Sequence, residues 1–345
     1  MIHAIEFIYY FKLSDQNNTV VISCCTKNFI IQIKEIINLF NLNFILLFSL
    51  EKIDFVSSMF NRMPLKLIRL YVSKNRVKKI LNKKNINLLV LGNYSNFISQ
   101  YCTQQIKSEI HVLDDGIGSL TFSAKNRINE INNQIPIFNF NYKKTALWIV
   151  KLIMNFNNYV IPEKITFFSS YNFDVLGKDK HILNDYSFLK SLYQKQKIDS
   201  EKVFFIGSPL SEVGFINLNR ETDLIINYSR QLKSSKLFYI PHRKDSKKKI
   251  DLIRKHLEIL QFNLPIEFAL TKIEALPHTI TGFSTSALPS LKKILRKEVS
   301  FCAVAIPKKY YFDLTTANRI SEVYNSFSSK FKIIDISNTD LFPLL

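Results

Sequence analysis

The chain has 345 residues, of which 47% are hydrophobic, so it is long enough for two domains with separate cores and too apolar for disorder to be expected. Its 47 Lys and Arg residues against 28 Asp and Glu give a formal charge of +19, which implies an anionic partner: a nucleotide, a nucleic acid or an acidic membrane surface. The cysteines have no CxxC spacing, which argues against a disulfide framework or a structural zinc site and favours reduced core thiols at Cys24, Cys25, Cys102 and Cys302.

Short apolar strands alternate with amphipathic helices, a pattern that predicts parallel sheets covered by helices. The strands expected in the first half span residues 20–24, 43–48, 86–91 and 110–113, with a helix over about 28–40. Those expected in the second half span 165–168, 203–206, 237–240, 279–283 and 299–305. We therefore expect two doubly wound domains, over residues 1–160 and 161–345, connected by a helical segment over 142–163.

A basic segment lies in the first half. Pro64 suits the first position of a helix, and nine Lys and Arg residues fall between positions 62 and 84. This face is expected to be solvated on a packed helix, and docking onto anionic lipid or a phosphorylated acceptor is the alternative. The most apolar run, residues 36–50, is shorter than the roughly 20 residues that a membrane-spanning helix needs. We expect a cytoplasmic protein, and peripheral contact with the inner face of the membrane stays open.

Two adjacent carboxylates, Asp114 and Asp115, follow the expected strand 110–113 and precede Gly116. Open α/β sheets bind their ligands at the carboxyl ends of the strands, and a glycine there lets a substrate approach the backbone. A carboxylate in this place can take a proton from an attacking hydroxyl. The alternative is an Asp-rich turn with a capping role only.

Polar residues also follow two expected strands of the second half. His242 follows the strand 237–240 and precedes a helix expected over about 246–261. It can stabilise or protonate a departing phosphate there, although a single histidine after a strand is more often structural. Three hydroxyls follow the strand 279–283 at the start of an expected helix, and they suit either a phosphate cradle or an ordinary N-cap: Ser284, Thr285 and Ser286.

Two further carboxylates are candidates. Glu267, in the apolar sequence Leu-Pro-Ile-Glu-Phe, is suited to accept hydrogen bonds from ribose hydroxyls. Glu212 follows the strand 203–206 and the glycine at Gly207, and it is the reserve candidate for a base.

The order of these motifs is Asp-Asp-Gly, then Pro-His-Arg, Pro-Ile-Glu and Gly-Phe-Ser-Thr-Ser. It resembles that of bacterial sialyltransferases, especially the lipooligosaccharide sialyltransferases of glycosyltransferase family 52 and the related polysialyltransferases. These families share an acidic Asp/Glu-Asp/Glu-Gly motif, a His-Pro motif and a Ser-Ser/Thr motif. The resemblance spans about residues 110–291. It implies a GT-B fold of two Rossmann-like domains facing a cleft, an inverting mechanism, and CMP-activated sialic acid or a related nonulosonic acid as donor.

The resemblance also implies residue roles. Asp115 would be the general base, His242 would assist the CMP leaving group, and Glu267 would hold the ribose. Ser284, with Thr285 or Ser286, would bind the phosphate of CMP. Asp114, Gly116 and Gly207 are further expected substrate-binding residues. A CMP-sugar has one phosphate and the chain has no Asp-x-Asp motif, so neither a metal nor another cofactor is expected. One departure bears on the donor, because Arg243 stands where the family has a proline.

The expected acceptor is a hydroxyl of a surface glycan such as lipooligosaccharide or capsule, whether or not it is lipid-linked, and nucleic acid is not an expected partner. Whether the chain forms a homodimer stays open. Two alternatives remain: a transferase that uses CMP-Kdo or a nucleoside-diphosphate sugar, and a basic, non-enzymatic nucleic-acid-binding protein. Steeply salt-dependent binding to generic DNA without CMP binding would favour the last of these.

Overall fold

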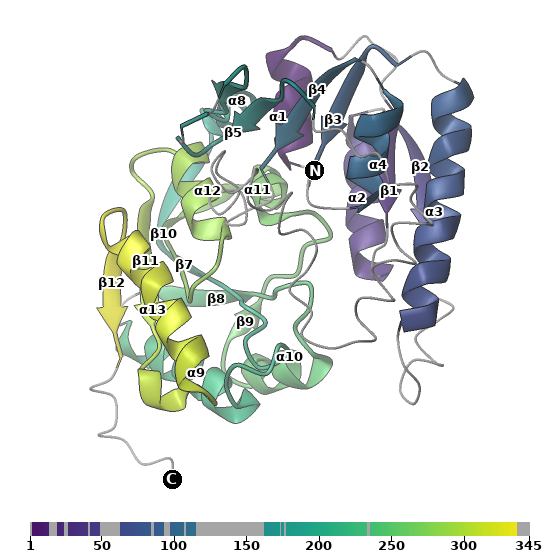
Figure 1. Cartoon of the computed structure of the whole chain (residues 1–345). Coiled ribbons are helices and arrows are strands. Elements are labelled where there is room, and N and C mark those ends of the chain that lie inside the picture. The colour runs from purple at the N-terminus through teal and green to yellow at the C-terminus, as the bar shows by residue number, and fades with distance from the viewer. Residues whose placement is uncertain are drawn as a thin grey trace. The chain divides into compact units, whose positions relative to one another are not determined.

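The computed structural model divides the chain into two compact units, Met1–Phe188 (unit 1) and Leu189–Leu345 (unit 2) (Figure 1). Each unit is described by itself. The described residues are 2–13, 19–23, 27–40, 42–48, 63–83, 86–92, 97–106, 108–114, 162–172, 174–175, 177–232 and 235–336.

Unit 1 contains two sheets, both parallel. One pairs β1 (Thr19–Ser23) with β2 (Asn43–Phe48), and the other has the order β3-β4-β5-β6, with β3 (Leu88–Leu91), β4 (Glu109–Leu113), β5 (Thr166–Ser169) and β6 (Lys180–Leu183). The helices are α1 (Ile2–Tyr10), α2 (Lys27–Leu39), the basic α3 (Met63–Lys83) and α4 (Phe97–Gln105).

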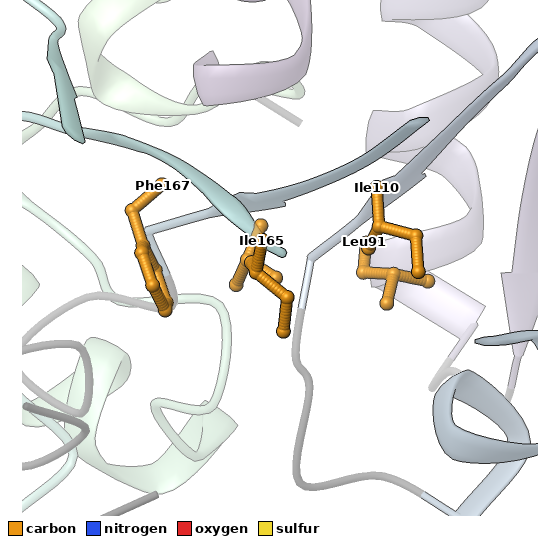
Figure 2. Close-up of a cluster of buried hydrophobic side chains, with 5 residues drawn as sticks. Leu91, Ile110, Ile165 and Phe167 are labelled. Carbon is orange, nitrogen blue, oxygen red and sulfur yellow. The ribbon is translucent and has the colours of Figure 1, made fainter. Parts of the chain in front are cut away.

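The core of unit 1 lies on both faces of the four-stranded sheet. One cluster, drawn in Figure 2, consists of Leu91, Ile110, Val112, Ile165 and Phe167. A second cluster joins Phe168 to Phe7 of α1, whose rings are 5.4 Å apart in an edge-to-face contact. Because consecutive side chains of a strand point to opposite faces, the burial of both Phe167 and Phe168 means that both faces are covered.

Unit 2 contains a six-stranded parallel sheet of order β12-β11-β10-β7-β8-β9. Its strands are β7 (Lys197–Ile206), β8 (Lys236–Ile240), β9 (Glu258–Ile259), β10 (Ala275–Gly282), β11 (Ser300–Ala305) and β12 (Lys332–Asp335). The chain runs from β7 outward to β9, then crosses back to β10 on the other side of β7. The strand order therefore reverses between β7 and β10, which is the point where doubly wound sheets bind their ligands.

The remaining helices are those of unit 2 and α8 (Ser187–Tyr193), which spans the boundary between the two units. Those of unit 2 are α9 (Leu218–Gln231), α10 (Lys247–Arg254), α11 (Ile266–Ala269), α12 (Ala287–Ile294) and α13 (Leu314–Ser328), with 3₁₀ turns η2 (Leu270–Lys272) and η3 (Lys308–Tyr310). Among the described residues, none of the helices combines the length and apolar character of a membrane span.

The α/β class, with parallel sheets in both units as expected for the GT-B type, is confirmed. The boundary between the units lies at residues 188 and 189 instead of about 160. The reason is that β5, expected as the first strand of the second domain, pairs with β4, and β6 pairs with β5. The expected connecting helix over 142–163 lies almost wholly outside the described residues.

Candidate functional site

Three of the loops selected from the sequence follow adjacent strands of unit 2. Residues 207–209 follow β7, residues 241–246 follow β8, and residues 283–286 follow β10, and these strands are neighbours in the order β10-β7-β8. Because all three strands are parallel, the loops lie at the same edge of the sheet, on both sides of the point where the strand order reverses. The sheet therefore gathers the predicted nucleotide-binding loops of unit 2 at one edge.

Glycines allow these loops to pack closely. A Cβ on Gly207 would lie 2.5 Å from the Tyr239 hydroxyl and 2.9 Å from the His242 backbone nitrogen. A Cβ on Gly282 would lie 2.7 Å from the Ile206 carbonyl oxygen. Both glycines are thus required by contacts within the protein. For Gly207 this packing role stands beside the predicted role in substrate binding.

Lys249 of α10 is the centre of a buried ionic network behind these loops. Its ammonium donates to the Ser208 carbonyl oxygen at 2.7 Å and to Asp245 Oδ1 at 3.0 Å, and it also donates to the Glu221 carboxylate. Glu212 Oε2 lies 3.6 Å away. The side chains of Lys249, Asp245 and Glu221 have no exposed surface. One ammonium therefore faces three carboxylates, two of them wholly buried.

The pKa values follow from burial and from this pairing. Burial raises the pKa of Asp245 and of Glu221 above the ordinary carboxyl values, and the nearby Lys249 only partly offsets that rise. Burial alone would lower the pKa of Lys249, but Asp245 and Glu221 outweigh it and raise the pKa. Lys249 is therefore charged at neutral pH. Two of its partners take up protons more readily than exposed carboxylates do.

Glu212, the reserve candidate for a base, holds the start of α10. Its Oε1 accepts from the Ser246 backbone N–H at 2.8 Å, and its Oε2 accepts from the Ser211 hydroxyl at 3.1 Å. Burial raises the pKa of Glu212, but the Ser246 hydrogen bond and Lys249 outweigh burial and bring it below the ordinary value. The carboxylate is thus ionised and engaged within unit 2.

Asp245 fixes the loop that carries His242. Its Oδ2 accepts from the His242 backbone N–H at 2.9 Å and from the Tyr239 hydroxyl at 2.6 Å. The Lys244 backbone N–H lies 3.2 Å from His242 Nδ1, so Nδ1 is the acceptor and the ring proton is assigned to Nε2. Burial, and then the charges of Arg243 and Lys244, lower the pKa of His242 to about 4. The imidazole is therefore neutral at pH 7 and presents one N–H donor.

The loop after β10 begins α12. Thr285 turns the chain: its N–H donates to the Phe283 carbonyl oxygen at 2.9 Å, and its hydroxyl accepts from the Ala287 N–H at 3.3 Å. Ser286 is exposed, and Ser284 is half-buried. The Ser208 hydroxyl, at the end of β7, is buried and has no hydrogen-bond partner among the described residues. A buried hydroxyl in this state is suited to a ligand.

Glu267 lies on α11 and is connected to α12. Its Oε1 accepts from the Ser290 hydroxyl at 2.7 Å, and its side chain is buried. Burial raises the pKa of this carboxyl, and the bond from Ser290 opposes the rise only in part. Its backbone carbonyl accepts from the Tyr193 hydroxyl. Glu267 is therefore a buried carboxyl held next to the helix that follows the Ser-Thr-Ser loop.

Asp114 is the described part of the acidic motif and lies in unit 1. It follows β4, and its Oδ2 accepts from the Ser170 backbone N–H at 2.6 Å, just beyond β5. The side chain is buried, and Oδ1 has no hydrogen-bond partner among the described residues. Asp115 and Gly116 lie outside the described residues. The structure thus connects Asp114 to the carboxyl end of the neighbouring strand. The role of Asp115 as the base stays a prediction.

The residues that sequence reasoning missed are Lys249, Asp245 and Glu221. Lys249 ends a run of three lysines that is typical of a solvated surface. Its spacing carried a signal, because Asp245 precedes it by four residues and Ile253 follows it by four, and residues four apart share one face of a helix.

No protein-family model and no curated protein sequence matches the chain. Solved structures do resemble it. MurG of Acinetobacter baumannii is 11% identical with a TM-score of 0.42, over 99% of this chain and 84% of that one. LpCGTa, solved in complex with UDP, is 11% identical with a TM-score of 0.48, over 100% and 85%. The calicheamicin glycosyltransferase CalG4 is 8% identical with a TM-score of 0.48, over 93% and 86%. At these identities the likeness is one of fold alone.

Proposed function

We propose that the chain is an inverting glycosyltransferase that moves sialic acid, or a related nonulosonic acid, from its CMP-activated form to a hydroxyl of a surface glycan, without a metal. The observation that supports the proposal most is the common edge of β10, β7 and β8. The loops expected to bind CMP from the sequence alone lie there, at the point where the strand order reverses. The buried Ser208 hydroxyl at the same edge, which has no hydrogen-bond partner within the described part of the chain, also favours a ligand.

In this proposal, unit 2 meets the charge that develops on the departing CMP phosphate. The neutral His242 donates a hydrogen bond through Nε2–H, while the hydroxyls of Ser284 and Ser286 add further donors. The N–H groups at the start of α12 are not used in this way, because those of Ala287 and Leu288 donate to Thr285 and Pro289 has none. Fixed donors of this kind stabilise a leaving group best when they need no rearrangement, and Asp245 supplies that rigidity for His242. Glu267 would accept bonds from the ribose hydroxyls.

Unit 1 would supply the base. Asp115 would take the proton of the acceptor hydroxyl as that oxygen attacks the anomeric carbon, while the bond to the CMP phosphate breaks. Asp114 would hold the turn through its bond to Ser170. The acceptor hydroxyl of this proposal belongs to a glycan such as lipooligosaccharide or capsule.

A second candidate uses a nucleoside-diphosphate sugar or CMP-Kdo. Two exposed cations, Arg243 and Lys244, follow His242 directly, and Arg243 stands in place of the proline that the family has. An additional pair of positive charges beside the site suits a second phosphate. The fold and the loops would be the same for both candidates.

Thermal unfolding with CMP, UDP, GDP and ADP in turn, in the presence of EDTA, distinguishes a CMP-sugar donor from a nucleoside-diphosphate sugar. Release of CMP from CMP-sialic acid and from CMP-Kdo then distinguishes those two donors. A nucleotide that binds the folded protein at about 100 times its Kd stabilises it by about 2.7 kcal/mol. CMP is expected to give the largest stabilisation, and His242→Ala is expected to lose part of it. A larger effect of UDP or GDP would favour a nucleoside-diphosphate sugar, and no effect of any nucleotide would contradict both candidates.

Turnover is expected to persist in EDTA, because a CMP-sugar has one phosphate and the proposal assigns its charge to His242 and to hydroxyl donors. The measurement is CMP release from CMP-sialic acid with and without chelator. Loss of most activity in EDTA, restored by Mg²⁺ or Mn²⁺, would contradict this donor assignment.

A further inference from the structure

A second surface of unit 2 is built from two loops joined by backbone pairing. Ile216 and Tyr311 form an isolated antiparallel bridge, and the Phe312 N–H donates to the Phe215 carbonyl oxygen at 3.0 Å. Asp313 then caps α13 by accepting from the Thr316 N–H at 2.7 Å. The segment between η3 and α13 is thus held at several points along its backbone.

This backbone pairing turns apolar side chains outward. Tyr311 is extended and buried, so the next side chain along the chain points to the opposite side. Phe312 is accordingly 65% exposed, and Leu314 in the first turn of α13 is 70% exposed. Val213, in the loop just before Phe215, is 42% exposed. The exposure of Phe312 therefore follows from how this loop is fixed.

Cations lie against two aromatic rings of the same loops. The Arg220 guanidinium lies 4.5 Å from the centre of the Tyr310 ring, and the Lys309 ammonium lies 5.2 Å from the same ring. Arg319 of α13 lies 5.7 Å from the centre of the Phe215 ring. The neighbouring carboxylate of Asp313 is engaged at the helix cap. We call this surface the apolar–basic patch: Val213, Phe312 and Leu314 with Arg220, Lys309 and Arg319.

We propose that the apolar–basic patch docks the protein onto an anionic lipid bilayer. Exposed aromatic and aliphatic side chains insert at the boundary of headgroups and acyl chains, while Lys and Arg around them bind anionic headgroups. A twofold contact with a second copy would bring each patch against itself and oppose cations to cations. Nucleic acid would use the cations and leave Leu314 and Val213 in water. The proposal does not depend on which donor the protein uses.

The test measures co-sedimentation of the full chain with vesicles of phosphatidylglycerol mixed with phosphatidylcholine, and with vesicles of phosphatidylcholine alone. The wild type is expected to bind the anionic vesicles, and less so as salt rises. Phe312→Ser combined with Leu314→Ser is expected to weaken binding at least about tenfold, from the loss of apolar burial. Changing Arg220, Lys309 and Arg319 to Gln is expected to weaken it about fivefold per cation removed.

Matched controls lie elsewhere on the chain. Leu192→Ser removes another exposed leucine, and Lys78→Gln with Lys79→Gln removes two exposed cations of α3; both are expected to bind as the wild type does. Unchanged thermal unfolding would show that all variants are folded. Normal binding by the patch variants, equal binding to neutral vesicles, or loss of binding only in the α3 variant would overturn the proposal. The proposal would also be overturned if light scattering showed a dimer for the wild type and a monomer for the Phe312→Ser, Leu314→Ser variant, and neither protein bound lipid.

Discussion

Asp245 Oδ2 accepts the backbone N–H of His242 at 2.9 Å, so a buried carboxylate holds the loop of the predicted leaving-group histidine. The other oxygen of Asp245 accepts from the Lys249 ammonium at 3.0 Å. The position of His242 therefore depends on an ionic network that lies behind the candidate site. Lys249 and Asp245 act as positioning residues in this account, because they reach the site only through the loop that they hold.

Removing the ammonium leaves the carboxylates of the network without their counter-ion. We expect Lys249→Met to destabilise the protein by about 3–5 kcal/mol, as the loss of one partner of a buried ion pair does. Lys248→Met, at the exposed neighbouring position, is the matched control and should change little. Urea unfolding of both variants measures the difference, and equal stability of the two would contradict the role given to the network.

The titration of His242 should reflect its burial. Its pKa of about 4 lies below the ordinary 6.5, so folding favours the neutral ring. The stability from this group is complete above pH 6.5 and is lost as the pH falls toward about 4. Because a bound phosphate favours the charged imidazolium, saturating CMP should raise the pKa.

The measurement for His242 is an NMR pH titration of the imidazole protons, with the resonance assigned by its absence in His242→Gln. Arg243→Gln should move the pKa upward, since the Arg243 charge is the second cause of the depression after burial. A ring that titrates at or above 6.5 in the free protein would contradict the geometry described for this loop.

Glu267→Gln separates the charge of this residue from its packing. The amide still accepts from the Ser290 hydroxyl, so the fold should persist, while a charge-assisted bond to ribose is lost. We expect CMP affinity to fall by about 1.5–3 kcal/mol in titration calorimetry. Ser290→Ala removes only the supporting bond and should keep most of the affinity. Unchanged affinity in folded Glu267→Gln would remove Glu267 from the ribose site.

The sequence predicted most strands and loops of unit 2 because apolar runs of four to six residues followed by polar turns are local signals. It could not say which sheet a strand joins. The run 165–168 was expected to open the second domain, yet β5 pairs with β4, and that pairing is decided by contacts far apart in the chain.

The helix expected over about 246–261 is also shorter in the structure. α10 ends at Arg254, and β9 at Glu258–Ile259 then pairs with β8. The apolar residues after Arg254 fit a helical period, but residues 258 and 259 form the edge strand of the sheet. The ionic network was hidden for a related reason: Lys249 pairs with Glu221 of α9, which lies 28 residues earlier in the chain.

The two carboxylates of the acidic motif, Asp114 and Asp115, are expected to have different roles. Asp114→Ala leaves the buried Ser170 N–H without its acceptor, so we expect a loss of about 1–3 kcal/mol in stability and only a moderate loss of turnover. Asp114→Asn, which can still offer an oxygen to that N–H, should recover most of the stability. Urea unfolding and transfer rates on both variants measure this, and a stability like the wild type's for Asp114→Ala would contradict the bond to Ser170.

The central claim is a transferase with its base at Asp115 and its leaving-group donor at His242. Sugar transfer from CMP-sialic acid and thermal stabilisation by CMP, measured side by side on the wild type, Asp115→Ala and His242→Ala, test it most directly. Asp115→Ala should lose roughly 10²–10⁴ in kcat and keep the wild-type stabilisation by CMP, because a base acts on the acceptor hydroxyl. His242→Ala should lose both rate and part of the stabilisation. Near-normal transfer by folded Asp115→Ala, or absence of CMP binding by the wild type, would contradict the account.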